Sequence, residues 1–324
     1  MSLSVIDDSE TVTLGPSKDG TYNGAMGGTE LMNKALYERV DNDLLDEFYI
    51  IKSRVRWTDR KKKNLLWLHD TWDDPESQHL REAESRNRFK KLVFVSNYQL
   101  QTYNMGLGVP YSQSVVLKNA IDPIPQHEKS KDQIKLIYHT TPHRGLNILV
   151  AAVKELAKTF GDKIHLDVYS SFEAYGWKER DKPFEQLFQE IKDHPQMTYH
   201  GYQPNDVVRK ALQEAHIFGY PNIWPETSCI AAIEAMSAGC EVVCPNFAAL
   251  PETTGSFARM YNFHEDVNEH ANIFVNQLYH SINQRLSDYM VAKLDFQKNW
   301  VDNFYSWDLR AAEWTAFLQS LRNK

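Results

Sequence analysis

The sequence of 324 residues predicts an α/β fold built on parallel sheets and divided into two domains. From about residue 28 onward, short apolar runs rich in β-branched and aromatic residues alternate with amphipathic helical patterns. This alternation is typical of parallel strands covered by helices on both faces. The polar segment 122–131, which contains two prolines, is the best linker candidate and splits the chain into about 122 and about 200 residues.

The first part of the chain is expected to hold four buried strands, at residues 48–51, 65–68, 92–95 and 115–117. Its beginning is irregular, because residues 11–14 are the only candidate for an opening strand and a glycine-rich loop follows over 15–28. A helix is expected over 29–40, with Thr29 as a candidate N-cap. Gly27 and Gly28 either allow close backbone approach to a ligand or form an ordinary turn before this helix.

The second part is expected to hold five strands, at residues 134–138, 166–169, 197–199, 217–220 and 241–244. Residues 146–160 show a clear helical pattern, with apolar side chains at positions 146, 149, 150, 153, 156 and 157. The last stretch, 301–321, is expected to be one amphipathic helix that packs onto a domain. It contains Trp307, Trp314 and Phe317.

The composition, with 42% hydrophobic and 24% charged residues, is that of a globular protein. No window approaches about 18 consecutive apolar residues, so we expect no transmembrane helix. No positively charged start leads into an apolar run, so we expect no secretory signal. The formal net charge of −7 argues against general nucleic-acid binding. Cys229, Cys240 and Cys244 lie among partly apolar neighbours without zinc-site spacing, which indicates buried free thiols in a reducing, cytoplasmic compartment.

The stretch 219–252 reads as a strand, a loop and a helix, followed by another strand. We expect the helix at 229–237, with Thr227 or Ser228 as its N-cap and Gly239 just past its end. A helix that begins after the carboxyl end of a strand is a ready anion site, and ligands of open α/β sheets bind at those strand ends.

Two carboxylates frame this helix. Glu226 lies at its mouth and Glu234 follows eight residues later, which corresponds to roughly 10–12 Å along the axis. Carboxylates accept hydrogen bonds from vicinal sugar hydroxyls, so a ligand with two sugars joined by a diphosphate would fit. Taken alone, the pair favours a simpler interpretation, with one acid at its favourable helix N-terminus and one solvated acid further on.

The stretch contains Glu226-x7-Glu234, then Ala235-Met236-Ser237-Ala238-Gly239 and, further on, Pro251-Glu252. This arrangement resembles the donor-binding motif of the retaining family 4 glycosyltransferases of GT-B fold, and the resemblance favours the ligand site. Four other segments match the family in the right order: Gly27-Gly28-Thr29-Glu30, Asn119-Ala120-Ile121-Asp122, Arg144-Gly145-Leu146 and His200-Gly201-Tyr202. The match is strong over about 115–260 and weak before residue 60.

This resemblance implies a GT-B architecture of two Rossmann-like domains that face each other across a cleft. Residues 1–122 would form the acceptor-side domain, joined by the C-terminal helix 301–324 crossing back, and 123–300 the donor-binding domain. It also implies a hexosyltransferase that uses a nucleotide-diphosphate sugar, UDP- or GDP-linked, with retention and without a metal or further cofactor. The acceptor would be a glycan, a lipid-linked carbohydrate or a small molecule.

The resemblance also implies roles for individual residues. Glu234 would bind the ribose and Glu226 the transferred sugar, while Arg144 would neutralise the departing diphosphate. His69 would contact the acceptor, with Ser96 and Asn97 as secondary candidates. The remaining donor contacts would come from Gly27, Gly28, Gly201, Tyr202 and the backbone N–H groups of Thr227, Ser228 and Cys229. The family often has a second basic residue beside Arg144; here Gly145 follows, so His139 or His143 is the candidate to assist.

Several alternatives remain open at this point. A sugar-nucleotide 2-epimerase shares the architecture, and a non-catalytic nucleotide-sugar binding subunit would explain the short first domain. Asp41-Asn42-Asp43 has the letters of the metal motif of GT-A enzymes but follows a helical pattern. A basic cluster could touch anionic lipid or an anionic acceptor, or be a solvated loop. It comprises Lys52, Arg54, Arg56, Arg60, Lys61, Lys62 and Lys63.

Overall fold

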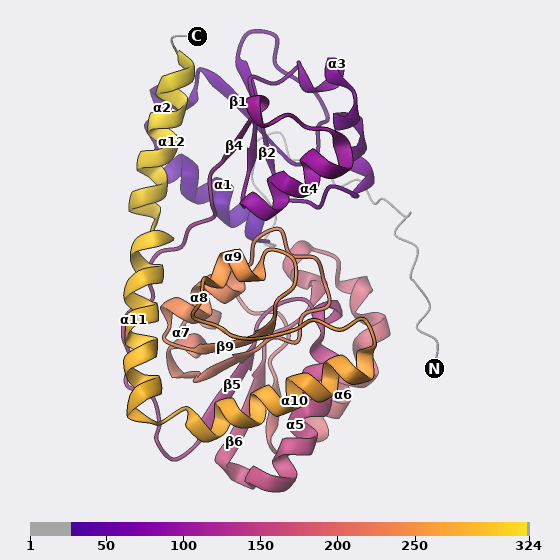
Figure 1. The fold of residues 1–324 in the computed structure, drawn as a ribbon, viewed down its shortest axis with the longest axis vertical. Coiled ribbons are helices and arrows are strands. Elements are labelled where there is room, and N and C mark those ends of the chain that lie inside the picture. The colour runs from indigo at the N-terminus through magenta and orange to yellow at the C-terminus, as the bar shows by residue number, and fades with distance from the viewer. Residues whose placement is uncertain (1–26, 323–324) are drawn as a thin grey trace.

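The computed structural model describes residues 27–322, which form two α/β domains, one above the other in Figure 1. The candidate strand at 11–14 and most of the glycine-rich loop lie outside the described residues. Every strand pair within the two sheets is parallel. The predicted α/β fold with two parallel sheets is confirmed.

The N-terminal domain is built on one four-stranded sheet, in the order β1-β2-β3-β4. Its strands are β1 (Phe48–Lys52), β2 (Lys63–Leu68), β3 (Lys91–Phe94) and β4 (Ser114–Val116), and its helices are α1 (Gly28–Arg39), α2 (Asn42–Leu45), α3 (Ala83–Arg86) and α4 (Asn97–Leu107). Successive residues of a strand point to opposite faces. Leu65 and Trp67 therefore pack in one hydrophobic cluster, and Leu66 and Leu68 in the other. Burial on both faces explains why these strands read as continuous apolar runs.

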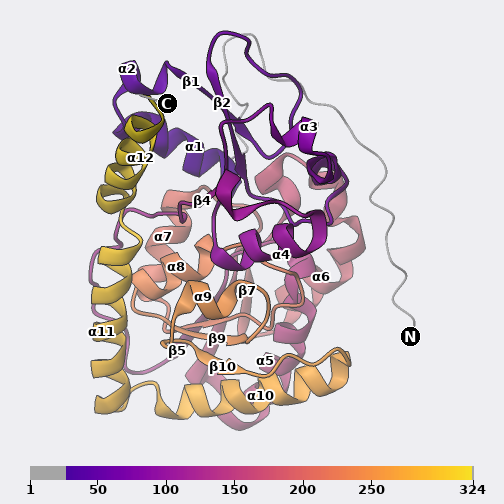
Figure 2. The ribbon, with the colours of Figure 1, turned by 45° about the horizontal axis from the view of Figure 1, so that its top comes forward.

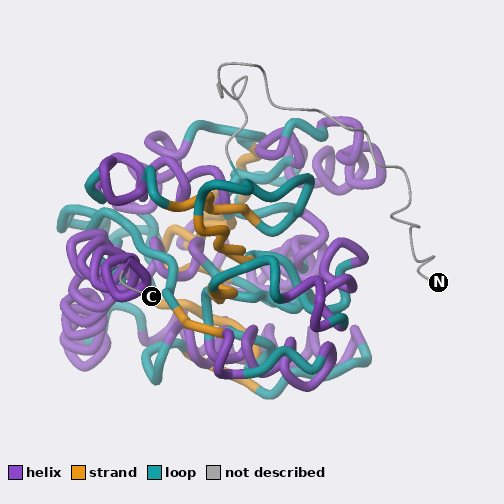
Figure 3. Tube along the Cα trace, turned by 90° about the horizontal axis from the view of Figure 1, so that it is seen from above, coloured by secondary structure: helices purple, strands orange, loops and turns teal. Residues whose placement is uncertain are grey.

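The C-terminal domain contains a six-stranded sheet, in the order β10-β9-β8-β5-β6-β7. Its strands are β5 (Ile134–Tyr138), β6 (Ile164–Val168), β7 (Met197–Tyr199), β8 (Ile217–Gly219), β9 (Glu241–Pro245) and β10 (Arg259–Tyr261), and its helices are α5 (Leu146–Phe160), α6 (Glu185–Asp193), α7 (Asn205–Glu214), α8 (Ile230–Ser237), α9 (Leu250–Thr254) and α10 (Val267–Gln284). Seen from above, helices lie on both sides of the strands (Figure 3). Strand β10 was not predicted, because its three residues include two that are only half-buried and give no apolar run.

The order of the strands reverses between β5 and β8. The chain runs outward from β5 to β6 and β7, then returns to β8 on the other side of β5. In such sheets a crevice opens between the carboxyl ends of the two central strands, and ligands bind there. The segments that follow β5 and β8 are therefore the ones that the fold places at a ligand site.

Two helices at the C-terminus connect the domains: α11 (Asp288–Phe304) and α12 (Trp307–Arg322). Helix α11 packs on α8 of the C-terminal domain, whereas α12 packs on α1 and α2 of the N-terminal domain (Figures 1 and 2). The ring of Trp314 in α12 meets Trp67 edge-on, with centroids 4.9 Å apart. The predicted return of the C-terminal helix to the first domain is confirmed.

The prediction of one continuous helix over 301–321 is wrong. Helix α11 ends at Tyr305, and Ser306 forms a β-bridge with Ile121. The N–H of Ile121 donates to the carbonyl of Tyr305 at 2.8 Å. The chain thus passes between the domains at two places, near Ile121 and near Ser306, and these two segments lie side by side. Ala120 packs in the N-terminal cluster and Ile121 in the C-terminal one, next to the predicted boundary at 122.

A membrane span is not found within the described chain, where the helices are all too short or too polar to cross a bilayer.

Candidate active site between the two domains

A cavity of about 640 Å³ lies between the domains, beyond the carboxyl ends of β5 and β8. This volume falls in the range of small-molecule sites. The predicted catalytic and donor-binding residues that line it are Gly27, Gly28, His69, Arg144, Tyr202, Glu226, Thr227, Ser228, Cys229 and Glu234. Gly201 does not line it, and neither do the secondary acceptor candidates Ser96 and Asn97 or the assisting candidate His143. The topology therefore brings together residues that are up to 207 positions apart in the sequence, from Gly27 to Glu234 (234 − 27 = 207).

Glycine is required at two points of the wall. Gly145 joins β5 to α5 with φ +108°, and a Cβ there would lie 2.1 Å from the carbonyl oxygen of Pro221. At Gly27 a Cβ would meet the ring of Tyr175 at 2.4 Å. Gly145 lets the turn after β5 approach the β8–α8 loop closely, and Gly27 lets the N-terminus of α1 approach the segment after β6 that carries Tyr175.

The start of α8 differs from the prediction. The N-cap is Cys229, without a side-chain cap, so the prediction of Thr227 or Ser228 as N-cap is wrong. The hydroxyl of Thr227 instead donates to the carbonyl of His69, across the domain interface, at 2.7 Å. Because no side chain within residues 27–322 caps α8, the first N–H groups of the helix remain suited to an anionic group of a ligand.

An ion pair joins the two sides of the crevice. Arg144, in the turn after β5, donates from Nη1 to Oε1 of Glu226, which follows β8, and the hydroxyl of Tyr220 donates to the same oxygen. Burial alone would lower the pKa of the Arg144 guanidinium, but the Glu226 carboxylate more than reverses this and raises it. The cation is therefore already in place in the wall of the cavity, with its Nε unpartnered among residues 27–322.

Glu234 is held at the far end of α8 by residues that the sequence did not single out. Arg209 donates from Nη1 to its Oε1 at 3.1 Å, and Asn205 donates at 3.3 Å. Burial raises the pKa of the Glu234 carboxyl, against the opposing effect of these two partners. Asn205 and Arg209 lie four residues apart in α7 and so share one face of the helix. This spacing of four residues was the feature of the sequence that could have identified Asn205 and Arg209 as a pair.

The histidines at the site are neutral near pH 7. Burial and the charge of Lys52 lower the pKa of His69 to about 3. Burial also lowers the pKa of His139 to about 4 and that of His143 to about 3. The expectation that His139 or His143 supplies a second positive charge is therefore wrong. Nε2 of His69 is buried and has no hydrogen-bond partner in the described chain.

The His200-Gly201-Tyr202 segment, from which donor contacts were expected, follows β7 at one end of the cavity. Gly201 turns the chain with φ +65° but does not line the cavity, whereas Tyr202 does. His200 donates from Nε2 to Oδ1 of Asp167 at 2.7 Å and stacks on Tyr169, with the ring centroids 4.3 Å apart. Tyr169, which sequence reasoning missed, adds an aromatic ring to this end of the cavity.

Other polar atoms of the wall are buried and lack a hydrogen-bond partner within residues 27–322. Besides Nε2 of His69 and Nε of Arg144, these are Oδ1 of Asn119, Nδ1 of His139 and Oγ1 of Thr141. Native proteins rarely leave such groups unpaired outside ligand sites. Asn119 belonged to a matched segment of the sequence but was given no role.

Two other candidates from the sequence, the Asp41-Asn42-Asp43 segment and the basic cluster, make contacts within the protein. Asp41 caps α2, accepting from the N–H groups of Asp43 and Leu44, and no group of three or more His, Cys, Asp or Glu in the described chain is arranged to hold a metal ion. Several charges of the basic cluster are paired within the N-terminal domain or with the C-terminal helix: Arg54 with Asp74, Arg56 with Glu76, Lys62 with Asp46, and Lys63 with the carbonyls of Leu321 and Arg322.

Comparison with solved structures places this fold among glycosyltransferases. A glycosyltransferase from Rickettsia africae superposes with a TM-score of 0.68 at 16% identity, over 94% of this chain and 85% of that one. Anabaena HepE in complex with UDP-glucose gives 0.62 at 13% identity, over 80% and 72%. The pneumococcal O-GlcNAc transferase GtfA in complex with UDP and GlcNAc gives 0.63 at 9% identity, over 82% of this chain and 53% of that one.

Comparison with curated proteins finds no match. The family model for glycosyl transferases group 1 matches residues 118–286, just over half of the chain, and this stretch carries Arg144, Glu226 and Glu234. With the two facing parallel-sheet domains of the GT-B fold and the cavity between them, the chain belongs to the glycosyl transferases of group 1 and is a glycosyltransferase.

Proposed function

We propose that this protein is a retaining, metal-independent glycosyltransferase that moves a sugar from a nucleotide-diphosphate sugar to a carbohydrate or lipid-linked acceptor. The observation that carries the proposal is the Arg144–Glu226 pair at the uncapped start of α8, inside a cavity that also contains Glu234. The cation and the helix N-terminus suit the diphosphate of such a donor, and the two carboxylates suit the sugars on either side of it.

In this proposal the donor lies across α8. Glu234 accepts hydrogen bonds from the ribose, and Glu226 from hydroxyls of the transferred sugar. HepE and the pneumococcal transferase were solved with UDP-glucose and with UDP and GlcNAc, respectively, which supports a uridine nucleotide as the first donor to test. No cofactor besides the donor is required.

The reaction exchanges one bond at the anomeric carbon for another. The bond to the diphosphate oxygen breaks, the acceptor oxygen bonds on the same face, and the proton of the acceptor hydroxyl passes to the departing diphosphate oxygen. The anomeric configuration is therefore kept and no enzymic nucleophile is needed. Negative charge develops on the diphosphate as it leaves. Arg144 and the first N–H groups of α8 stabilise this charge more strongly than that of the intact donor. In this proposal the acceptor is contacted by His69, which is neutral and whose Nε2 has no hydrogen-bond partner among residues 27–322.

Thermal unfolding with UDP, GDP, ADP and their sugar conjugates, each with and without EDTA, tests the donor site. A ligand at 100 times its Kd stabilises the folded state by about 2.7 kcal/mol. We expect stabilisation by uridine nucleotides that EDTA does not change. Stabilisation that disappears with EDTA would contradict metal independence, and donor binding without transfer to any acceptor would favour a non-catalytic subunit.

We further propose a cytoplasmic location with weak peripheral contact to membranes. The three cysteines are free and buried, as suits a reducing compartment. Arg60 and Lys61 are exposed members of the basic cluster. Sedimentation with vesicles containing anionic lipid should show weak binding that falls as salt is raised from about 0.05 to 0.5 M. Binding that is absent, or that salt does not change, would contradict membrane contact.

A further inference from the structure

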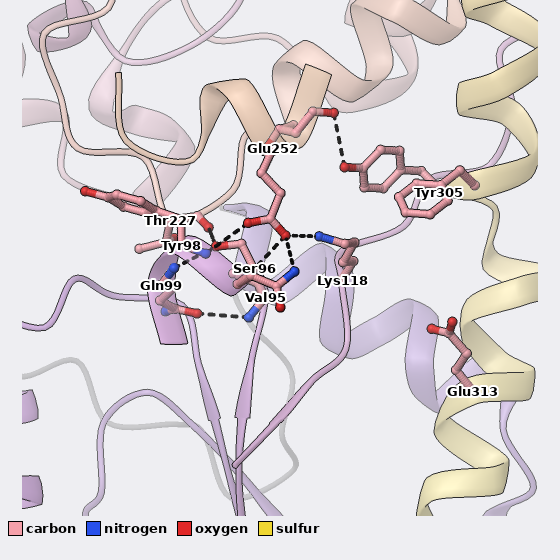
Figure 4. Close-up of polar contacts among 12 residues, drawn as sticks. Val95, Ser96, Tyr98, Gln99, Lys118, Thr227, Glu252, Tyr305 and Glu313 are labelled. Atoms are coloured by element: carbon pink, nitrogen blue, oxygen red, sulfur yellow. Dashed lines mark hydrogen bonds and ion pairs between the residues drawn. The ribbon is translucent and has the colours of Figure 1, made fainter. Parts of the chain in front are cut away.

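Glu252, in α9 of the C-terminal domain, reaches across to the start of α4 in the N-terminal domain (Figure 4). Its Oε1 accepts from the backbone N–H of Asn97 at 3.0 Å and from Nδ2 of Asn97 at 2.8 Å. Its Oε2 accepts from the N–H of Tyr98 at 2.9 Å. Lys118, which lies between the two domains in the sequence, forms an ion pair with the same carboxylate.

This carboxylate therefore acts as a helix cap supplied by the other domain. A negative charge is favourable at a helix N-terminus. Burial by itself would raise the pKa of Glu252, but the Lys118 ammonium and the two backbone N–H groups outweigh burial and lower it. The carboxylate is ionised at neutral pH and interacts with α4 by charge-assisted hydrogen bonds.

A second set of contacts lies beside the first and involves the donor loop. The hydroxyl of Ser96, just before α4, donates to the carbonyl of Thr227 at 2.6 Å. The hydroxyl of Thr227 donates to the carbonyl of His69 at 2.7 Å. From α4, Gln99 donates to the carbonyl of Asp70 at 2.9 Å. The segment that carries His69 is thus held by α4 on one side and by the residue after Glu226 on the other.

These cross-domain contacts are polar, and the hydrophobic cores are largely separate. The C-terminal core and the two N-terminal clusters share only Ile230, partly buried, among the described residues. Relative motion of two domains is the default unless the interface between them is large and hydrophobic. The group that links α9 to α4 is therefore well placed to set the position of His69 relative to the donor loop.

We propose that Glu252 is a positioning residue, which holds the N-terminal domain against the donor loop so that His69 and the Arg144–Glu226 pair face each other across the cavity. The proposal rests on the glycosyl transfer proposed above. Glu252 itself does not line the cavity, so it acts through α4, Ser96 and Thr227. It should contribute to the rate of transfer and little to the affinity for the nucleotide.

The test variant is Glu252→Gln, whose amide cannot accept hydrogen bonds from all of these donors and carries no charge for Lys118. The matched control is Glu76→Gln, which removes a carboxylate paired with Arg56 inside the N-terminal domain. A second variant, Thr227→Val, keeps the side-chain shape and removes only the hydroxyl that donates to His69. The interdomain distance is read from spin labels at Met105, which is 78% exposed in α4, and at Lys158 in α5.

We expect Glu252→Gln and Thr227→Val each to lower kcat about tenfold, with the Kd for UDP within twofold of the wild-type value. Because they act on one contact set, the double variant should lose less than the product of the two effects. Glu252→Gln should also broaden the distribution of interdomain distances. Glu76→Gln should change neither kcat nor this distribution. An unchanged kcat and an unchanged distance distribution in Glu252→Gln would overturn the proposal. If the wild-type protein bound no nucleotide, the proposed function would fail, while the distance measurement would still test the contact.

Discussion

Arg144→Ala is expected to lower kcat by about 10²–10³-fold, as removal of one preorganised charge-stabilising group typically does. The guanidinium already lies in the cavity wall, paired with Glu226, and needs no rearrangement to meet a departing diphosphate. Its contribution grows as charge develops, so kcat should fall more than the affinity for the intact donor. Steady-state kinetics with varied donor, together with calorimetric Kd values for the intact nucleotide sugar in the absence of acceptor, separates the two quantities.

Stability has to be measured beside activity, because this pair is buried. Removing one partner of a buried ion pair typically costs about 3–5 kcal/mol, and only 8% of the Glu226 side chain is exposed. The double variant Arg144→Met/Glu226→Gln leaves no unpaired charge and should recover much of the free energy of unfolding without recovering kcat. If Arg144→Ala lost stability while the folded fraction kept wild-type kcat, Arg144 would be structural and the site assignment wrong.

The sequence predicted most of the secondary structure, since strands buried on both faces leave apolar runs that are easily recognised. Helix α5 was predicted with the bounds that the structure shows. The break at Tyr305 was not, because residues 301–310 contain neither glycine nor proline and the helical pattern continues through them. The break is imposed by tertiary structure: Ser306 pairs with Ile121 where the chain passes between the domains.

At the site, the sequence identified individual residues but not their partners. Arg144 and Glu226 were each predicted, yet they are 82 positions apart, and only the adjacency of β5 and β8 brings them into contact. The same holds for Thr227, whose predicted capping role is replaced by a hydrogen bond to the other domain. Glu252 was one residue of a matched motif, and its contact with α4 depends on how the two domains meet.

The second large expected effect is on the affinity for UDP when Glu234 is substituted. Glu234→Gln is expected to raise the Kd for UDP by about 10–100-fold, because it replaces a charged acceptor of ribose hydrogen bonds by a neutral amide, and hydrogen bonds to charged groups are worth about 1.5–3 kcal/mol. The transfer step itself involves another part of the donor, so kcat at saturating donor should change much less. Glu190→Gln, which removes a carboxylate paired with Lys154 on the surface of the same domain, is the matched control.

The pH dependence of this affinity offers an independent check. Burial raises the pKa of Glu234 above that of an ordinary glutamate, so the carboxylate takes up its proton at a higher pH than a solvated one. A protonated carboxyl is a weaker acceptor, and the Kd for UDP should therefore rise as pH falls through that range. The phosphates of UDP also titrate in acid, but their contribution is common to wild type and Glu234→Gln. The difference between the pH dependence of the Kd in the wild type and that in Glu234→Gln therefore belongs to Glu234. If the Kd of both proteins changed identically with pH, Glu234 would not belong to the nucleotide site.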